Sequence, residues 1–403
     1  MTQSGRGGGP QLLRLMNCAA VLQAVRDTGS ARLADVVRAT GLSRPTVTAA
    51  VSTLIRDGWV EETEAPEDDS PRMGRPAKVV RFRADAAHVV GVDVGPHKVY
   101  CAVADLAGNV VVQERRDVAE PASHAGLLEH VESTVSLVLD RAGVERSAIA
   151  AVGVGTPGIV DERRGAIVQA PSVPGWAALE LGRTLQRTIA CPVYVENDVN
   201  LAVVAERANG SWDEADDMVL VQWGARVGAA VLLQGRLHRG ANGAAGEIGF
   251  IDLEEQPQGT QADGLGPLEA VTGTAQILRR ARELGDRTSH DAVAVLHAAA
   301  AGDPLALQVL DEVAAEFARG LAPFLTAIDP ALVVIGGGIT LAGDAILAAV
   351  RRHLEQRALV VPRLELSSLG DDAVALGAVR LALDHAERQL LDVYSPPGTR
   401  RDR

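Results

Sequence analysis

The stretch "PVYVENDVNLAVVAE", residues 192–206, decides the fold because a short apolar run gives way to a helical pattern at Asn197 and Asp198. The residues up to Asp198 predict a strand, and those after it predict a helix. Asp198 has three possible roles: a base that moves a proton, a ligand for a polar molecule, or a cap for the helix. This stretch alone does not choose among them.

The surrounding sequence repeats this order of elements. From His88, three strand-like runs separated by Gly turns precede a helical stretch over residues 125–142 and a strand, "AIAAVGVGTPG". A similar order restarts at "MVLVQWGARVGAAVLLQGRL" and ends with the strand "ALVVIGGG" and a helix from Asp371. Two successive copies predict two α/β lobes with a cleft near residues 195–270. Ligands in such folds bind at strand ends that face the cleft.

The N-terminal region has another pattern. An apolar helical run ends at Gly29, and a second helix reaches Thr40. A turn through Gly41 and Leu42 leads to a third helix, with Ser43 as its N-cap and its end near Asp57. Two short helices joined by a Gly turn predict a helix-turn-helix.

The third helix has polar residues suited to the major groove of DNA, where base edges are read by short polar and basic side chains. Its inward positions are apolar: Leu42, Val47, Val51 and Leu54. The outer face that we expect to meet DNA carries Ser43, Arg44, Thr46, Thr48 and Ser52. An ordinary helical hairpin without DNA is the competing interpretation.

A wing is predicted after this helix. Residues 59–62 and 78–82 have strand-like sequences around a polar, Pro-rich tip. Arg72, Arg75 and Lys78 form a basic, extended element of the kind that binds the A·T minor groove. The acidic residues 67–69 would be repelled by phosphate unless the tip points away from the duplex. Arg-Pro turns also occur on inert loops.

Composition limits the partners. The chain has 403 residues and a formal net charge of -13, which disfavours general adhesion to nucleic acid or anionic lipid, so any DNA contact must be local. Its three cysteines are far apart and in apolar contexts, so neither a disulfide framework nor a CxxC metal site is expected. The N-terminus has no apolar leader and no run is long enough to span a membrane. We therefore expect a cytoplasmic protein with no membrane partner.

Residues 11–387 resemble the ROK family (repressors, open reading frames and sugar kinases), in particular its transcriptional members, such as the xylose and N-acetylglucosamine repressors. The matching stretches are "GRPAKVV", "GVGTPGIVD", "PGW", "CPVYVENDVNLAVVAE", "GRLHRGANGAAGEIGF", "PLEA" and "VVIGGG". The resemblance implies an α/β protein, with a winged helix-turn-helix before a two-lobed, actin-like ATPase body. The expected division is a disordered tail (1–9), a DNA-binding domain (10–84), a sugar-kinase-like domain (85–390) and a flexible tail (391–403).

The resemblance also implies a sugar site. In the family the acid of the "ND" pair is the kinase base, so Asp198 would take a proton from a sugar hydroxyl, while Asn197, Glu247 and Glu269 would hold hydroxyls. Carboxylates and amides suit vicinal hydroxyls, each of which both donates and accepts. This chemistry does not distinguish binding from catalysis.

Two departures from the family pattern affect phosphate binding. The phosphate loop expected as Asp-x-Gly-Gly-Thr is "DVGPHK", so Pro96 and His97 replace a small residue and a hydroxyl. The element expected as Gly-Thr-Gly is "GAR", which places Arg226 where backbone should approach phosphate. Phosphoryl transfer depends on positioning and electrostatics, so we predict a pseudokinase with no catalytic residue and Asp198 as a vestigial base.

A third departure removes the family's zinc site, which uses one His and three Cys. The four positions hold Phe250, Thr260, Ala262 and Pro267, and none of these is a zinc ligand. We therefore expect no metal and no cofactor. The missing His also touches sugar in the family, so Phe250 weakens the sugar assignment.

These features favour a DNA-binding repressor of carbohydrate-related genes whose body senses a sugar or a related metabolite. An active ATP-dependent sugar kinase with an added DNA-binding domain, and a regulator controlled by a protein partner without a sugar ligand, are the alternatives. The expected DNA partner is a double-stranded operator. A helix-turn-helix normally reads two half-sites as a symmetric dimer, so we expect a homodimer or a tetramer.

Overall fold

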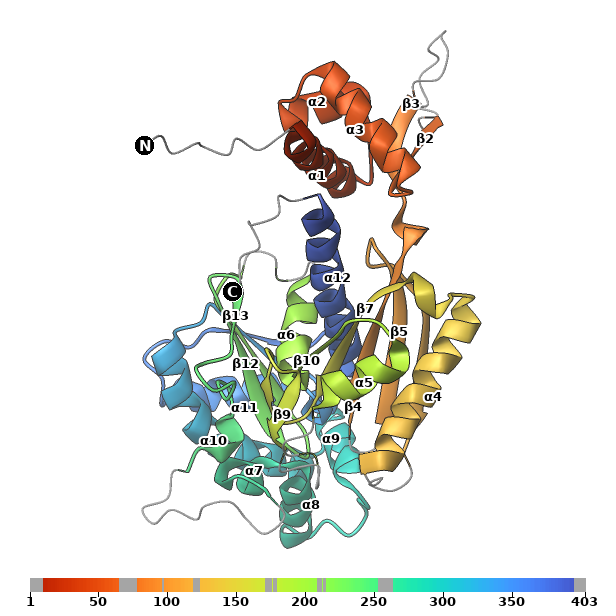
Figure 1. Ribbon diagram of the computed structural model, residues 1–403. Coiled ribbons are helices and arrows are strands. Elements are labelled where there is room, and N and C mark those ends of the chain that lie inside the picture. The colour runs from red at the N-terminus through yellow and green to blue at the C-terminus, as the bar shows by residue number, and fades with distance from the viewer. Residues whose placement is uncertain are drawn as a thin grey trace, which may run out of the picture.

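The computed structural model describes residues 10–64, 78–95, 98–118, 124–170, 176, 180–208, 212, 215–252 and 264–394. Its N-terminal unit is a winged helix-turn-helix, drawn in red and orange in Figure 1. The elements are α1 (Pro10–Thr28), β1 (Ser30–Arg32), α2 (Leu33–Thr40), α3 (Arg44–Arg56), β2 (Val60–Glu64) and β3 (Lys78–Phe82). The strands form an antiparallel sheet in the order β1-β3-β2.

Local sequence explains the turn between α2 and α3. Gly41 has φ of 67°, a left-handed conformation that glycine adopts at low cost, and it ends α2. The Ser43 hydroxyl then accepts a hydrogen bond from the Thr46 backbone N–H, which begins α3. Val47, Val51 and Leu54 are buried and Leu42 is partly buried, as predicted. The strand β1 was not predicted, because three residues are too few to show a period.

The first lobe of the body is built on a mixed sheet in the order β10-β7-β4-β5-β6. Its elements are β4 (His88–Val94), β5 (Lys98–Asp105), β6 (Val110–Asp117), α4 (His124–Ala142), β7 (Ile149–Thr156), β8 (Ile159–Asp161), β9 (Ala166–Gln169), α5 (Leu181–Ile189), β10 (Val193–Asn197) and α6 (Asp198–Ala208). The strand pair β8-β9 forms a separate hairpin. In the quoted stretch, the predicted change from strand to helix occurs between Asn197 and Asp198.

The second lobe repeats the plan with a sheet in the order β13-β12-β11-β14-β15. Its elements are β11 (Met218–Trp223), β12 (Val227–Leu233), β13 (Arg236–His238), α7 (Pro267–Thr272), α8 (Thr274–Glu283), α9 (Ala292–Ala300), α10 (Pro304–Ile328), β14 (Leu332–Gly336), α11 (Asp344–Leu354) and β15 (Arg363–Leu366). Short 3-10 turns also occur at Ala84–Ala86, Arg146–Ala148, Ile248–Phe250, Gly338–Ala342 and Gly370–Asp372. The two α/β lobes predicted from the repeated order are therefore present.

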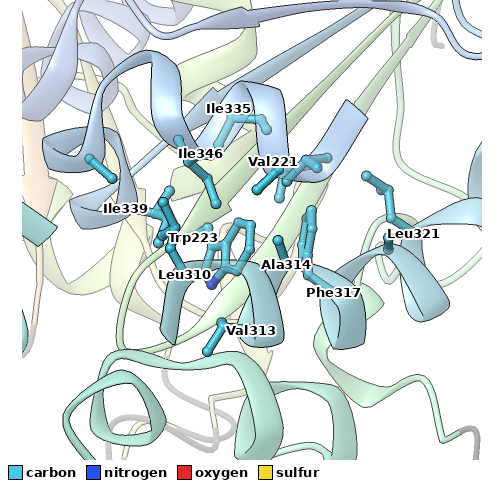
Figure 2. Close-up of a cluster of buried hydrophobic side chains, with 14 of the residues drawn as sticks. Val221, Trp223, Leu310, Val313, Ala314, Phe317, Leu321, Ile335, Ile339 and Ile346 are labelled. Carbon is cyan, nitrogen blue, oxygen red and sulfur yellow. The ribbon is translucent and has the colours of Figure 1, made fainter. Parts of the chain in front are cut away.

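The core of the second lobe lies between its sheet and α10 (Figure 2). Trp223 is fully buried and stacks on Phe317, with ring centroids 3.8 Å apart. Its indole N–H donates to the carbonyl oxygen of Thr272 over 2.9 Å, so the indole also satisfies its polar atom. Because Trp223 ends β11, this packing fixes the start of the following turn, Gly224–Arg226.

The last helix, α12 (Ala373–Val393), joins the body to the DNA-binding unit. It packs on α6 and on strands β4 and β7 of the first lobe. Figure 1 shows its far end (dark blue) reaching towards α1. Glu387 forms an ion pair with Arg26 of α1, and the Tyr394 hydroxyl donates to a carboxylate oxygen of Asp57 over 3.0 Å.

The contacts of Glu387 and Tyr394 show that the ordered chain extends beyond the boundary expected at residue 390. A flexible tail was predicted from residue 391, but α12 continues to Val393 and Tyr394 is buried. The physical reason is that the end of α12 shares a hydrophobic cluster with α1, α3 and the wing strands. Residues 395–403 and the predicted tail 1–9 lie outside the described residues.

In the described part of the chain, no single helix is both long and apolar enough to cross a membrane. One pair, α9 and α10, meets that test when taken together, although it is bent by 108°. The apolar side chains of both helices contribute to the core of the second lobe.

Candidate functional site

The predicted DNA-reading face of α3 is exposed. Ser43, Arg44, Thr48 and Ser52 point to solvent, and Thr46 is partly exposed. The hydroxyls of Thr48 and Ser52 donate to carbonyl oxygens one turn back on the helix. The Ser43 hydroxyl lies 2.8 Å from that of Thr46. These bonds hold the short side chains against the helix, which leaves Arg44 as the long basic side chain of the face.

Lys78 lies at the base of the wing. Its ammonium group is 2.8 Å from a carboxylate oxygen of Glu62 on the neighbouring strand, and its side chain is exposed. An exposed pair of this kind contributes little to stability. Arg72 and Arg75 lie outside the described residues.

In the stretch of residues 192–206, Asn197 is the N-cap of α6. Its side-chain oxygen accepts from the Asn200 backbone N–H over 3.0 Å, which is N-cap geometry for α6. Its amide N–H donates to the carbonyl oxygen of Gly158 over 3.0 Å. Asn197 thereby ties the turn after β7 to the start of α6, and it holds the neighbouring Asp198 in place.

Asp198 is the first residue of α6 and is partly buried. Its carboxylate accepts from the Val199 backbone N–H over 2.9 Å. Burial, and then the nearby negative charge of Asp93, raise the pKa of Asp198 to about 6, against the opposing effects of backbone hydrogen bonds and Lys98. The carboxyl therefore titrates close to neutral pH.

Asp93 of β4 is itself buried, and the Lys98 ammonium group of β5 lies 2.9 Å from its carboxylate. Burial raises the pKa of Asp93, and Lys98 opposes that effect. The two residues flank the altered phosphate loop, of which Pro96 and His97 lie outside the described residues. Lys98 was not singled out from the sequence, because only the fold places it beside Asp93.

Glu247 completes a group of four acids, which we call the acidic cluster: Asp93, Asp198, Glu247 and Glu269. Burial, with the charges of Asp198 and Glu269, raises the pKa of Glu247 to about 7. Two other sugar-contact residues predicted from the sequence, Asp198 and Glu269, thus act on the pKa of a third, Glu247. Asn197 is adjacent to Asp198 in the chain.

Glu269 lies on α7 and is buried. Its two oxygens accept from the backbone N–H groups of Val227 and Gly266, each over 2.9 Å. The Arg226 guanidinium lies 3.4 Å from the same carboxylate and donates to the carbonyl oxygen of Gly264 over 2.7 Å. Glu269 therefore holds α7, the start of β12 and the side chain of Arg226 together.

Of the four positions that align with the family's zinc ligands, Phe250 and Pro267 are described, and Thr260 and Ala262 are not. The segments around Phe250 and Pro267 are in close contact, since a Cβ at Gly266 would collide with the carbonyl oxygen of Gly249. Within the described residues, no group of three or more His, Cys, Asp or Glu side chains could hold a metal ion. Close backbone packing and the Glu269 hydrogen bonds hold these segments together.

Both the helix-turn-helix and the body are similar to known protein families. The ROK family model matches residues 89–385, and the model of the IclR helix-turn-helix domain matches residues 15–64. The xylose repressor of Caldicellulosiruptor bescii is 24% identical over 93% of this chain and 97% of its own length. The glucokinase of Halalkalibacterium halodurans is 30% identical over 72% of this chain and 92% of its own.

Among solved structures, a ROK family transcriptional regulator that is a homologue of the E. coli MLC protein has a similar fold. The TM-score is 0.77, with 22% identity, 95% coverage of this chain and 99% coverage of the other. The likeness extends over the helix-turn-helix as well as the body.

Proposed function

The chain belongs to the ROK family, and from this membership we propose that it is a DNA-binding transcriptional regulator, a repressor of carbohydrate-related genes. The single observation that carries the proposal is the exposed polar face of α3 on a winged helix-turn-helix fused to a ROK body. A relative named a repressor matches the chain over 93% of its length, whereas the glucokinase matches 72%.

For DNA recognition, we propose that α3 enters the major groove. Arg44 reads a base edge, and Ser43, Thr46, Thr48 and Ser52 contact bases or the backbone around it. Lys78, with Arg72 and Arg75, lies along the minor groove and adds cations to a chain that is acidic overall. The operator is double-stranded DNA read by two copies of the protein, as a dimer or a tetramer.

For the effector, we propose a sugar or a sugar derivative bound at the acidic cluster. Asp198 and Glu247 are the acceptors best placed for hydroxyl groups, because the Glu269 oxygens already accept from two backbone N–H groups. Asn197 contributes its second amide hydrogen. Xylose is the first sugar to test, since a relative is named a xylose repressor.

The body acts without phosphorylating the sugar, and we propose that it is a pseudokinase. Supporting this, each of the two altered phosphate elements carries or adjoins a cation that pairs with an internal acid. Lys98 pairs with Asp93 and Arg226 with Glu269. A cation that is paired with an internal carboxylate stabilises the negative charge of a transferred phosphoryl group less strongly. We propose no cofactor and no zinc, and elemental analysis that finds one zinc per chain would overturn the latter.

One observation favours the sugar kinase as a second candidate. A pKa of about 6 suits Asp198 to act as a general base near neutral pH. An ATP-dependent phosphorylation assay on a sugar panel separates the two candidates. The regulator predicts no turnover above background, and turnover at an enzyme-like rate that is lost in Asp198→Asn would establish the kinase.

The proposed function itself is tested by mapping the binding sites of the purified protein on genomic DNA. Enrichment of a two-fold symmetric site beside sugar-related genes is expected. Absence of any enriched sequence would contradict the proposal. A sugar panel in thermal-shift experiments tests the effector, and the regulator controlled by a protein partner predicts no stabilising sugar.

A further inference from the structure

One cavity of the body is lined by residues other than those of the acidic cluster. It has a volume of about 750 Å³ and is bounded by β10, by α6, by the turn after β8, by the hairpin of β12 and β13, and by residues 380–388 of α12. None of the four acids of the acidic cluster is among the described residues that line it. A cavity of this volume is in the range that holds a metabolite-sized ligand.

The cavity wall has an excess of positive charge. Among the residues that the structure describes, five arginines and three carboxylates line it. Glu162 and Glu196 both pair with Arg239, at 2.8 and 2.6 Å. Asp384 pairs with Arg380 at 2.6 Å. Every carboxylate of the wall is therefore already matched to an arginine.

Two arginines of the wall remain without an acid. In the described part of the chain, neither Arg163 nor Arg388 forms an ion pair, and both side chains are exposed. Among the described residues, the Arg388 side chain forms one hydrogen bond, from its Nε to the carbonyl oxygen of Asp384. None of these residues accepts from its terminal N–H groups, which can therefore bind an anion. A guanidinium presents parallel donors that match a phosphate group.

The remaining wall suits the body of an organic ligand. Val204, Leu237 and Leu381 supply apolar surface. Tyr194 stacks on His385, with ring centroids 3.4 Å apart, and accepts a hydrogen bond from Gln389, so its own phenolic hydrogen is available to a ligand. Burial, followed by the charges of Arg388 and Arg239, lowers the pKa of His385 to about 4, so this ring is neutral at pH 7.

We propose that this cavity, the α12 pocket, is a second ligand site that binds a small phosphomonoester, such as a sugar phosphate or a nucleoside monophosphate. The phosphate is held by Arg388 and Arg163, and the organic part lies on the apolar wall beside Tyr194. Inorganic phosphate can use the arginines but not the wall, so it binds more weakly.

The pocket is lined by α12, the helix that also contacts the DNA-binding unit. Arg380, Asp384, His385 and Arg388 line the pocket from α12, and Glu387 of the same helix pairs with Arg26 of α1. A ligand that prefers one position of α12 therefore biases the helix-turn-helix as well. This consequence rests on the proposed function, whereas ligand binding at the pocket does not.

Isothermal titration calorimetry on the full chain tests the site, with glucose 6-phosphate, AMP and inorganic phosphate as probes. Arg388→Glu and, as a second variant in an exposed turn, Arg163→Glu remove the proposed phosphate donors. Arg282→Glu is the matched control, because Arg282 is an exposed arginine of α8 outside the pocket. Asp198→Asn serves as the control for binding at the acidic cluster.

We expect one of the two organic phosphates to bind at least about tenfold more tightly than inorganic phosphate. Each pocket variant should lower the affinity for this organic phosphate by about tenfold or more, because the substitution removes a charge-assisted contact and adds repulsion. Arg282→Glu and Asp198→Asn should leave its affinity unchanged. The site is overturned if neither organic phosphate binds, if both pocket variants bind as wild type does, or if Asp198→Asn abolishes binding.

Discussion

At the residue scale, Asp198 has a neighbour that takes over one of its possible roles. Asn197 caps α6, so the carboxylate of Asp198 is not needed for that purpose. Its raised pKa comes from burial and from Asp93, a residue more than a hundred positions earlier in the chain. No sequence pattern predicts that Asp93 lies near Asp198, although the "ND" motif drew attention to Asp198.

The first prediction concerns Asp198→Asn. If the carboxylate accepts hydrogen bonds from a sugar, its loss removes about 1.5 to 3 kcal/mol per charge-assisted bond, so sugar affinity should fall by about tenfold to a hundredfold. DNA affinity without sugar should be unchanged, because the acidic cluster is separate from α3. Calorimetry and DNA-binding titrations measure the two quantities. An unchanged sugar response would leave Asp198 without a role in binding.

The second prediction concerns the pH dependence of stability. The pKa of Glu247 is about 7 in the folded chain and about 4.3 when unfolded, so the folded state binds the extra proton. The contribution of Glu247 to stability therefore falls as pH rises between these values and is constant above them. The free energy of unfolding of Glu247→Gln minus that of wild type should therefore be more positive at pH 8 than at pH 5, by about 2 to 3 kcal/mol.

Melting temperatures at the two pH values provide this comparison. Glu283→Gln, an exposed glutamate on α8, is the matched control and should follow wild type at both. The same difference between Glu247→Gln and wild type at pH 5 and pH 8 would show that Glu247 does not titrate in this range.

At the element scale, strong local signals predicted the helices, turns and buried strands well. Gly41 and Ser43 marked the turn between α2 and α3, and the repeated order of strands and helices predicted both lobes. The pairs Lys98–Asp93 and Arg226–Glu269 could not be predicted, because their partners meet only after the lobes fold. Arg226 was recognised as an unusual residue, but not as a partner of Glu269.

The third prediction concerns α3. Arg44→Ala should weaken binding to a mapped operator by about 1 to 3 kcal/mol and relax base preference at one position, since Arg44 is the long basic side chain of the exposed face. Arg56→Ala, at the other end of the same helix, is the control and should retain sequence preference. Competition titrations with operator variants measure both. Retention of operator affinity and preference by Arg44→Ala would remove α3 from the recognition role.

At the scale of the whole molecule, α12 connects the two functions. It packs against α6, whose first residue is Asp198, and its end shares a hydrophobic cluster with the helix-turn-helix. The sequence indicated a final helix but treated residues after 390 as a tail. Tyr394 ends this connection, and its contact with Asp57 forms only when the DNA-binding unit docks on the body, which local sequence does not encode.

The fourth prediction concerns that contact. Tyr394→Phe removes the hydrogen bond to Asp57 and keeps the buried ring. The effect of the sugar on DNA affinity should become smaller, because α12 then constrains α3 less strongly, while DNA binding without sugar should persist. Ser136→Ala, which removes a hydroxyl group of α4, is the control. An unchanged sugar effect in Tyr394→Phe would exclude this contact from the coupling.

The central claim is that a ROK body which binds a sugar controls a DNA-reading helix. The most direct measurement is a fluorescence-anisotropy titration of a mapped operator fragment with the full chain, without ATP, in the presence and absence of each sugar of a panel. One sugar should change operator affinity by about fivefold or more, the usual size of coupling between two sites, with no change on a scrambled fragment. Equal affinity for operator and scrambled DNA, with or without every sugar, would contradict the claim.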